Sequence, residues 1–402
     1  MSEHRSLEEA LNEEKTRFAQ KKGLAEEFLG EAKKSAQITK NAAQRSKEKA
    51  DIPAPGEKTA LVLSGGASRG AYEMGVWQAL IELGVRLDLV CGTSIGSMNA
   101  YMVASGAFEK SRNVWLDMKT EEVFNFDDAL ANHGGSFTGI KDILARDFPE
   151  EAVRSSGVDF GLCTVRLNEE GSMDPATWTP LYLWTKDIPE GKMMDYVLAS
   201  CAVYPVVRPY EIDGVKYLDG GFHDYIPVHM ALAAGADRII AVNLEAIGVV
   251  QGEDIEKAGA KLTLIEPSAE LGNIVKFDPA NTRRIMRLGY LDTMKIYGAF
   301  DGRTYTFMKG SMDQRSIAAA ERAGEILGLD SGVLYSGLSY RNALAHSIAQ
   351  ARESHSRQAV FLALCDNLKK QSAEHPLKES RMRGNLAKDR SAALWLIRSG
   401  LV

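Results

Sequence analysis

A serine flanked by two glycines is the first residue of this chain that could act as a nucleophile. The pentad Gly92-Thr-Ser94-Ile-Gly96 lies between an apolar run at 87–91 and a stretch with helical spacing at 95–104. A Gly-x-Ser-x-Gly sequence between a strand and a helix is typical of a nucleophile elbow, a sharp turn that projects the serine hydroxyl from the sheet. Glycines keep side chains out of that turn. The pentad therefore predicts a nucleophilic Ser94.

A glycine-rich segment, SGGASRG at residues 64–70, follows a short apolar run at 59–63. Backbone N–H groups in such a strand-to-helix turn can converge on an anion, so the segment fits either an oxyanion hole or a phosphate cradle. The dinucleotide fingerprint requires glycine where this chain has Ala67, although the acidic Asp88 lies close to the spacing of a ribose ligand. A P-loop would require Gly-Lys-Ser/Thr, which is not the sequence after Gly70.

A third candidate is the turn Asp219-Gly220-Gly221, which follows a strand-like run at 215–218. Catalytic groups of open α/β sheets gather at strand ends, so Asp219 is a candidate base for Ser94. Alone, an aspartate before two glycines is more typical of a simple turn. His223 and His229 follow closely, so a Ser-His-Asp triad is an alternative to direct proton transfer.

These residues need a scaffold that brings strand ends together. Short apolar runs alternate with stretches of helical spacing, which favours an α/β sheet with helices on both faces. The runs that we interpret as strands are 59–63, 87–91, 160–165, 181–184, 215–218 and 239–244. After about residue 298 the strand signals stop and the pattern is helical.

Composition excludes several other classes of protein. The 402 residues are 45% hydrophobic and 25% charged, with a net charge of −6 that gives no reason to expect a nucleic-acid partner. The four cysteines are far apart and lack metal-ligand spacing, so we expect neither disulfides nor a metal. The polar start and the absence of a run of about 18 apolar residues predict a cytoplasmic protein that meets lipid, if at all, from the water side.

Three regions are expected from these changes in pattern. Residues 1–57 read as a charged helical extension and linker, 58–300 as the catalytic domain and 301–402 as a helical C-terminal region. The stretch 369–402 carries eight Lys/Arg against three Asp/Glu and ends in several large apolar side chains. Such a tail could lie on an anionic membrane surface, or dock on the body of the protein.

The order of the three motifs SGGASRG, GTSIGS and DGG resembles the patatin-like phospholipase family. The similarity also includes ASCAVYP at 199–205 and several short matches between 265 and 290, and it extends from about 58 to 298. This resemblance implies a sheet sandwiched between helices and a Ser94–Asp219 dyad, with the oxyanion hole in the loop Gly65-Gly66-Ala67. It further implies a set of supporting residues: Arg69, Gly70, Gly92, Gly96, Gly220 and Gly221.

The resemblance implies a serine acyl hydrolase of phospholipase A or lysophospholipase type, which cleaves acyl esters of membrane glycerolipids without a cofactor. The chemistry is consistent, because acyl transfer needs an activated hydroxyl and donors for the oxyanion. Two alternatives stay open at this point. One is a non-catalytic lipid-binding or interaction protein on the same fold, and the other is a nucleotide-binding α/β enzyme that uses the SGGASRG loop.

Overall fold

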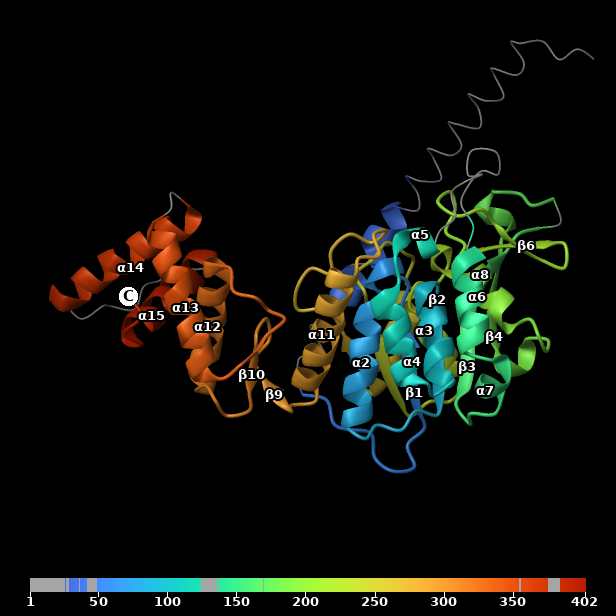
Figure 1. Cartoon of the computed structure of the whole chain (residues 1–402), viewed down its shortest axis with the longest axis horizontal. Helices are drawn as coiled ribbons and strands as arrows, with labels where there is room; N and C mark the ends of the chain where they lie inside the picture. Colours follow the sequence, from blue (N-terminus) through green and yellow to red (C-terminus); the bar gives the residue numbers. More distant parts are fainter. Residues whose placement is uncertain are drawn as a thin grey trace, which may run out of the picture. The chain divides into compact units, whose positions relative to one another are not determined.

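The computed structural model describes most of the chain in two compact units. The described residues are 26, 29–35, 37–41, 49–123, 136, 138–168, 170–353, 356–374 and 384–402. The N-terminal unit comprises Met1–Glu48, Ile52–Glu266 and Leu271–Met286, and the C-terminal unit comprises Lys49–Asp51, Pro267–Glu270 and Arg287–Val402 (Figure 1). The domain limits expected from the sequence remain a proposal, and each unit is described below by itself.

The N-terminal unit is built on a mixed sheet. Its strands in the described residues are β1 (Thr59–Leu63), β2 (Leu89–Thr93), β3 (Asp159–Arg166), β4 (Thr179–Trp184), β5 (Tyr210–Ile212), β6 (Val215–Asp219), β7 (Arg238–Val242) and β8 (Leu262–Ile265). Their order is β5-β6-β3-β2-β1-β7-β8, and β4 also pairs with β3. Strands β3, β2, β1, β7 and β8 are mutually parallel, whereas β4 and β6 run antiparallel to β3.

The central strands are apolar along their whole length because both faces of the sheet are covered. All five residues of β1, TALVL, are buried, as are the five of β2, and such continuous runs are typical of parallel strands between two helical layers. Strand β2 lies two residues later than the run at 87–91 suggested, so that Thr93 is its last residue. The carboxyl ends of β1 and β2 therefore bring the 64–70 loop and Ser94 to the same edge of the sheet.

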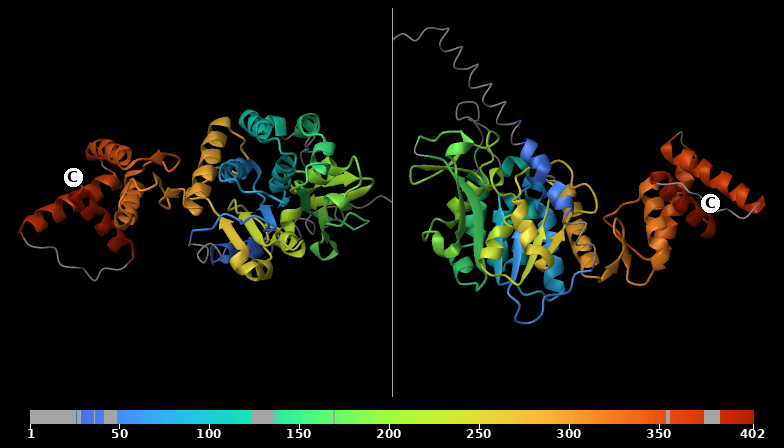
Figure 2. Two further views of the ribbon diagram at one scale, coloured as in Figure 1. Left: turned by 90° about the horizontal axis from the view of Figure 1, so that it is seen from below. Right: turned by 180° about the vertical axis from the view of Figure 1, so that it is seen from behind.

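Helices cover both faces of this sheet. Those of the N-terminal unit are α2 (Ala71–Glu82), α3 (Ile95–Ala104), α4 (Phe108–Asp117), α5 (Thr120–Val123), α6 (Thr138–Asp147), α7 (Glu150–Arg154), α8 (Met193–Ser200), α9 (Val228–Ala233) and α10 (Gly252–Ala258). Helix α3 packs on β1, β2 and β3, and α9 packs on β1, β2 and β7. Figures 1 and 2 show α2 and α3 in front of the sheet in one view and the yellow helices in front of it in the reverse view. The α/β sandwich expected from the sequence is thus confirmed.

The region before the sheet is helical where it is described, at 29–35 and 37–41. It is not merely a solvated extension there. The Ser35 hydroxyl accepts a hydrogen bond of 2.8 Å from the Val250 N–H, and Ile38 packs against the core between the sheet and α9–α10. The rest of the predicted extension lies largely outside the described residues.

The C-terminal unit has its own apolar core and is mainly helical. Its elements are the end of α11 (Pro279–Ile296), β9 (Phe300–Asp301), β10 (Thr306–Met308), α12 (Gln314–Leu327), β11 (Leu334–Tyr335), α13 (Gly337–Arg352), α14 (Arg357–Glu374) and α15 (Asn385–Arg398). The small sheet β11-β10-β9 was not predicted from the sequence, because strands of two or three residues are too short to show periodicity.

The basic C-terminal stretch is docked on this unit. Ala392, Ala393 and Leu396 of α15 are buried in its core, and Trp395 packs against them. Of the two interpretations of 369–402, the described part of the tail therefore favours docking. Among the described residues, every helix is too short or too polar to cross a bilayer.

Candidate active site

Ser94 occupies a strained turn between β2 and α3. Its backbone angles are φ 56° and ψ −128°, a region that non-glycine residues rarely adopt. The turn has no room for side chains on either side. A Cβ atom on Gly92 would lie 2.2 Å from the Gly96 carbonyl oxygen, and one on Gly96 would lie 2.4 Å from the Leu63 carbonyl oxygen. The pentad thus forms the sharp turn that its sequence predicted.

Asp219 lies at the end of β6, and its carboxylate is a hydrogen-bond partner of the Ser94 side chain. Its side chain is buried, and its Oδ1 accepts a 2.7 Å hydrogen bond from the Gly221 N–H. Burial raises the pKa of Asp219 to about 6, against the opposing effect of these two hydrogen bonds. A carboxylate with this pKa is a better proton acceptor than an exposed aspartate, yet it is still ionised at neutral pH.

The two glycines after Asp219 allow this close arrangement. A Cβ atom on Gly220 would lie 2.3 Å from the Cys163 carbonyl oxygen, and one on Gly221 would lie 3.1 Å from the Asp219 Oδ1. Gly220 is needed for packing against β3, and Gly221 is needed to present its N–H to the carboxylate.

The two histidines that could complete a triad, His223 and His229, contact other residues. The half-buried His223 ring lies 6.1 Å from the Tyr182 ring, and its burial lowers its pKa. His229 Nδ1 is 3.6 Å from an Asp254 carboxylate oxygen. In the described part of the chain, no histidine side chain hydrogen-bonds to Ser94 or Asp219. The geometry therefore favours direct contact between serine and aspartate.

The glycine-rich loop lies beside the nucleophile. A Cβ atom on Gly65 would be 3.3 Å from the Ser94 Cβ, and Ala67 lines the same pocket as Ser94. The Gly65 N–H already donates to the Tyr225 carbonyl oxygen at 3.2 Å. The N–H groups of Gly66 and Ala67 have no such backbone partner within the described residues. Of the three predicted oxyanion residues, Gly65 therefore has its N–H engaged within the loop, and the donor roles of Gly66 and Ala67 remain a prediction.

Ala67 stands where a third glycine is usual in the family that the motifs resemble. Its φ is 44°, in the left-handed region that favours glycine. The methyl group is accommodated at some conformational cost, and the N–H donor is kept.

Arg69 holds the loop from outside. Its Nη1 donates to the Leu244 and Glu245 carbonyl oxygens at 3.2 and 2.7 Å, and its Nη2 and Nε donate to the Gly272 carbonyl oxygen at 3.0 and 3.2 Å. These bonds favour a bracing role over an anion contact.

Gly70 permits close packing, because a Cβ atom there would lie 2.7 Å from the Ile95 side chain.

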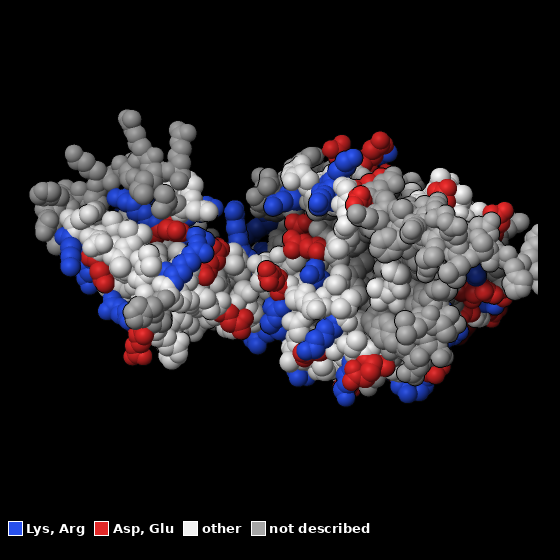
Figure 3. Space-filling model, turned by 90° about the horizontal axis from the view of Figure 1, so that it is seen from above, with Lys and Arg blue, Asp and Glu red and all other residues white. Residues whose placement is uncertain are grey.

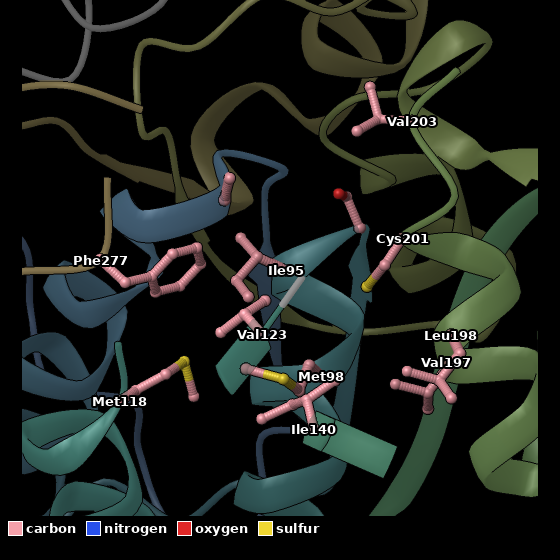
Figure 4. A pocket seen from close by; sticks show the side chains of 12 residues that line it. Ile95, Met98, Met118, Val123, Ile140, Val197, Leu198, Cys201, Val203 and Phe277 are labelled. Carbon is pink, nitrogen blue, oxygen red and sulfur yellow. The ribbon is translucent and has the colours of Figure 1, made fainter. Parts of the chain in front are cut away.

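An apolar pocket opens beside Ser94 (Figure 4). Its cavity volume is about 40 Å³, and aliphatic, methionine and phenylalanine side chains dominate its lining. The lining residues are Ala67, Ser94, Ile95, Met98, Met118, Val123, Ile140, Val197, Leu198, Cys201, Val203 and Phe277. Val203 is 39% exposed at the surface, so the pocket has an apolar opening.

Sequence reasoning missed the residues that hold the site from a distance. The Asn99 amide donates to the Gly70 carbonyl oxygen at 2.9 Å and to the buried Glu73 carboxyl at 2.7 Å, and burial raises the pKa of Glu73 well above its usual value. Tyr225 supports Gly65, as described above, and Ser200 contacts Ser94. No local pattern marks these residues, because each contact joins segments far apart in the sequence.

The Asp88 carboxylate, which was a candidate ribose ligand, makes its contacts at the start of β1, the end of that strand opposite to the glycine-rich loop. Its Oδ2 accepts from the Thr59 N–H at 2.9 Å, and its Oδ1 pairs with Arg86. Thr59 begins β1, whereas the glycine-rich loop follows its last residue. This placement gives the nucleotide interpretation no support.

Residues 61–232 match the family model described as patatin-like phospholipase. This segment of the chain therefore matches a patatin-like phospholipase domain. The similarity stated from the motifs alone is thus confirmed.

Individual proteins are similar to parts of the chain. Patatin-like phospholipase domain-containing protein 7 of Mus musculus is 27% identical over 203 residues, which are 47% of this chain and 14% of that protein. Lysophospholipase NTE1 of Mycosarcoma maydis is 28% identical over 201 residues, which are 48% of this chain and 10% of that protein. Among solved structures, VipD from Legionella pneumophila aligns at 15% identity with a TM-score of 0.38, covering 88% of this chain and 94% of that one. The matched segment is thus a small part of these curated relatives.

Proposed function

We propose that this protein is a serine lipid acyl hydrolase, of phospholipase A or lysophospholipase type, that works through a Ser94–Asp219 dyad. The observation that carries the proposal is the hydrogen bond between a strained serine and a buried aspartate whose pKa is raised to about 6. The match of residues 61–232 to the patatin-like phospholipase model and the apolar pocket beside Ser94 support it.

The proposed reaction has two halves that share one base. The Asp219 carboxylate takes the Ser94 proton while Oγ bonds to the ester carbonyl carbon, and the carbonyl oxygen becomes an oxyanion. The N–H groups of Gly66 and Ala67 stabilise this oxyanion. The leaving alkoxide takes the proton from Asp219 as its bond to the carbonyl carbon breaks. Water then loses a proton to Asp219, attacks the acyl-Ser94 ester and releases the fatty acid, and Ser94 regains the proton.

The proposed substrates are acyl esters of membrane glycerolipids, met at a bilayer surface. The pocket lining suits an acyl chain, and the exposed Val203 at its opening suits entry from an apolar phase. On the face shown in Figure 3, basic and acidic side chains are interspersed over the described surface. With a net charge of −6, this distribution gives no reason to expect a nucleic acid as the partner.

Removal of the nucleophile tests the proposal. Wild-type protein, incubated with mixed phospholipid vesicles, should release fatty acids and lysolipids that mass spectrometry identifies, and a serine-directed fluorophosphonate should label it. Ser94→Ala should abolish both signals. Ser105→Ala, a serine at the other end of α3, is the matched control and should keep them. Normal turnover by a folded Ser94→Ala protein would refute the enzyme mechanism.

The same labelling experiment separates hydrolysis from lipid binding alone. A non-catalytic lipid-binding protein would bind vesicles, but neither wild type nor any variant would react with the fluorophosphonate. We expect stoichiometric labelling of wild type, because the buried Asp219 activates Ser94.

A further inference from the structure

The strained backbone of Ser94 is held by a second serine from a distant helix. The Ser94 N–H donates to the Ser200 Oγ at 2.9 Å, and the Ser200 hydroxyl donates in turn to the Cys163 carbonyl oxygen on β3 at 2.7 Å. Ser200 is the last residue of α8 and is fully buried. One hydroxyl therefore joins the nucleophile elbow to the neighbouring strand.

The two residues after Ser200 extend this connection to the proposed base. The Ala202 carbonyl oxygen accepts a 3.0 Å hydrogen bond from the Asp219 N–H. Cys201 lies 4.0 Å through its Sγ from the Ser97 hydroxyl, which itself donates to the Ser94 carbonyl oxygen at 2.6 Å. The segment 200–202 thus contacts the main chain of Ser94, directly and through Ser97, and the main chain of Asp219.

This arrangement matters because the backbone of Ser94 is held in an unrelaxed conformation. A φ of 56° is unfavourable at a serine, so the turn keeps this conformation only while the surroundings enforce it. The Ser94 N–H also lies in a part-buried turn where the start of α3 supplies no partner, and an N–H left unpaired there is costly. The Ser200 hydroxyl meets both requirements.

We propose that Ser200 is a positioning residue, which holds the Ser94 backbone so that its hydroxyl stays in hydrogen-bond contact with Asp219. The proposal rests on the function proposed above, because it assigns a role within the same site. Ser200 contributes no atom to the reaction. It acts through Ser94, and its neighbour Ala202 fixes the other partner of the dyad.

The variant Ser200→Ala removes the hydroxyl and leaves the elbow N–H without its acceptor. Because a displacement of about 1 Å at a reacting group can cost 100-fold in rate, we expect kcat and the rate of fluorophosphonate labelling to fall 10- to 100-fold. KM should change less than threefold, because Ser200 is not among the residues that line the pocket. Ser105→Ala is the matched control, because the Ser105 hydroxyl makes the same two kinds of hydrogen bond. It accepts from the Ala107 N–H at 3.4 Å and donates to the Met102 carbonyl oxygen at 2.7 Å.

A second readout distinguishes positioning from a general loss of stability. The hydrogen bond from Ser94 lowers the pKa of Asp219, so a displaced Ser94 should release that carboxyl to a higher pKa. The pH of half-maximal rate should therefore move upward in Ser200→Ala and stay unchanged in Ser105→Ala. Ser200→Cys, which keeps the size of the side chain but replaces oxygen by a poor acceptor, serves if the alanine variant does not fold.

The outcomes separate this inference from the proposed function. A wild-type protein that is not labelled, or labelling that survives Ser94→Ala, would end the proposed function and this inference with it. Labelled wild type together with a folded Ser200→Ala or Ser200→Cys protein that keeps the wild-type rate and pH profile would overturn the positioning role alone. A rate loss of the same size in Ser105→Ala would also overturn it.

Discussion

At the scale of single residues, the main question is which group accepts the Ser94 proton. Asp219 is in hydrogen-bond contact with Ser94, whereas the His223 ring packs near Tyr182. We expect Asp219→Asn to lower the esterase rate by at least the 10²–10⁴-fold attributed to general base catalysis. His223→Ala should lose less than tenfold, measured by fatty-acid release from vesicles. Equal losses in the two folded variants would show a triad, because members of one catalytic unit fail together.

The raised pKa of Asp219 also predicts how rate and stability depend on pH. The proposed base must be ionised, so kcat/KM should rise with pH around a midpoint near 6. Stability should change in the opposite direction. The folded pKa lies above the unfolded value near 3.9, so the native state binds the proton more tightly, and stability is lost as pH rises from about 4 through 6.

Asp219→Asn removes this titration and keeps a carbonyl oxygen for the Gly221 N–H. Above pH 7 the variant should therefore exceed wild type in the free energy of unfolding by about 2–3 kcal/mol, and the difference should shrink toward pH 4. Urea unfolding at several pH values measures this. A variant that is less stable than wild type at pH 8 would show that the ionised carboxylate stabilises the fold.

At the scale of elements, the strand-turn-helix around Ser94 depends on contacts between backbone atoms. An added Cβ atom on Gly92 would lie 2.2 Å from the Gly96 carbonyl oxygen, and backbone cannot move aside as a flexible side chain can. We expect Gly92→Ala to destabilise the N-terminal unit by at least about 2 kcal/mol and to abolish labelling of Ser94.

Gly30→Ala is the control. A Cβ atom on Gly30, which lies in a helical segment, would meet nothing within 4 Å, so stability should stay equal or rise. Thermal unfolding of both variants checks this, and an unchanged Gly92→Ala melting temperature would contradict the packing argument.

The elements were predictable from the sequence to different degrees, for physical reasons. The run 59–63, the pentad and the DGG turn are local patterns, so the sequence predicted their structures and the α/β sandwich, which is confirmed. The roles of Ser94 and Asp219 remain predictions. Two hydrogen bonds could not be predicted, because each joins residues far apart in the sequence. The bond from the Gly65 N–H to the Tyr225 carbonyl oxygen spans 160 positions, and the bond from the Ser94 N–H to the Ser200 hydroxyl spans 106.

At the scale of the whole molecule, the chain divides its apolar interior between two units, and the proposed site belongs to one of them. Every residue proposed for the site lies in the N-terminal unit, while α12 to α15 enclose a separate cluster of buried side chains. The apolar residues of the last helix belong to that cluster, so their presence in the sequence reflects packing. Removal of this helix would therefore expose a core, and a truncated protein could not test membrane binding cleanly.

A single substitution in the last helix tests whether the proposed site is independent of the core of the C-terminal unit. Leu396 is fully buried in the core of the C-terminal unit, so Leu396→Ala should destabilise that unit by about 2–5 kcal/mol through lost burial and a cavity. Leu338→Ala is the control, because that side chain is 71% exposed and its loss should change stability by less than about 0.5 kcal/mol. Hydrogen exchange in peptides from α12 and α15, together with Trp395 fluorescence, reports on this unit separately, because the other four tryptophans lie in the N-terminal unit.

The decisive comparison is between local unfolding and fluorophosphonate labelling. Leu396→Ala should speed exchange in α12 and α15 while Ser94 keeps its wild-type labelling rate, because no proposed site residue belongs to the destabilised core. Exchange that stays slow would show that Leu396 packs less tightly than its burial indicates. A labelling rate that falls with the stability of the C-terminal unit would show instead that the reactivity of Ser94 depends on that unit being folded.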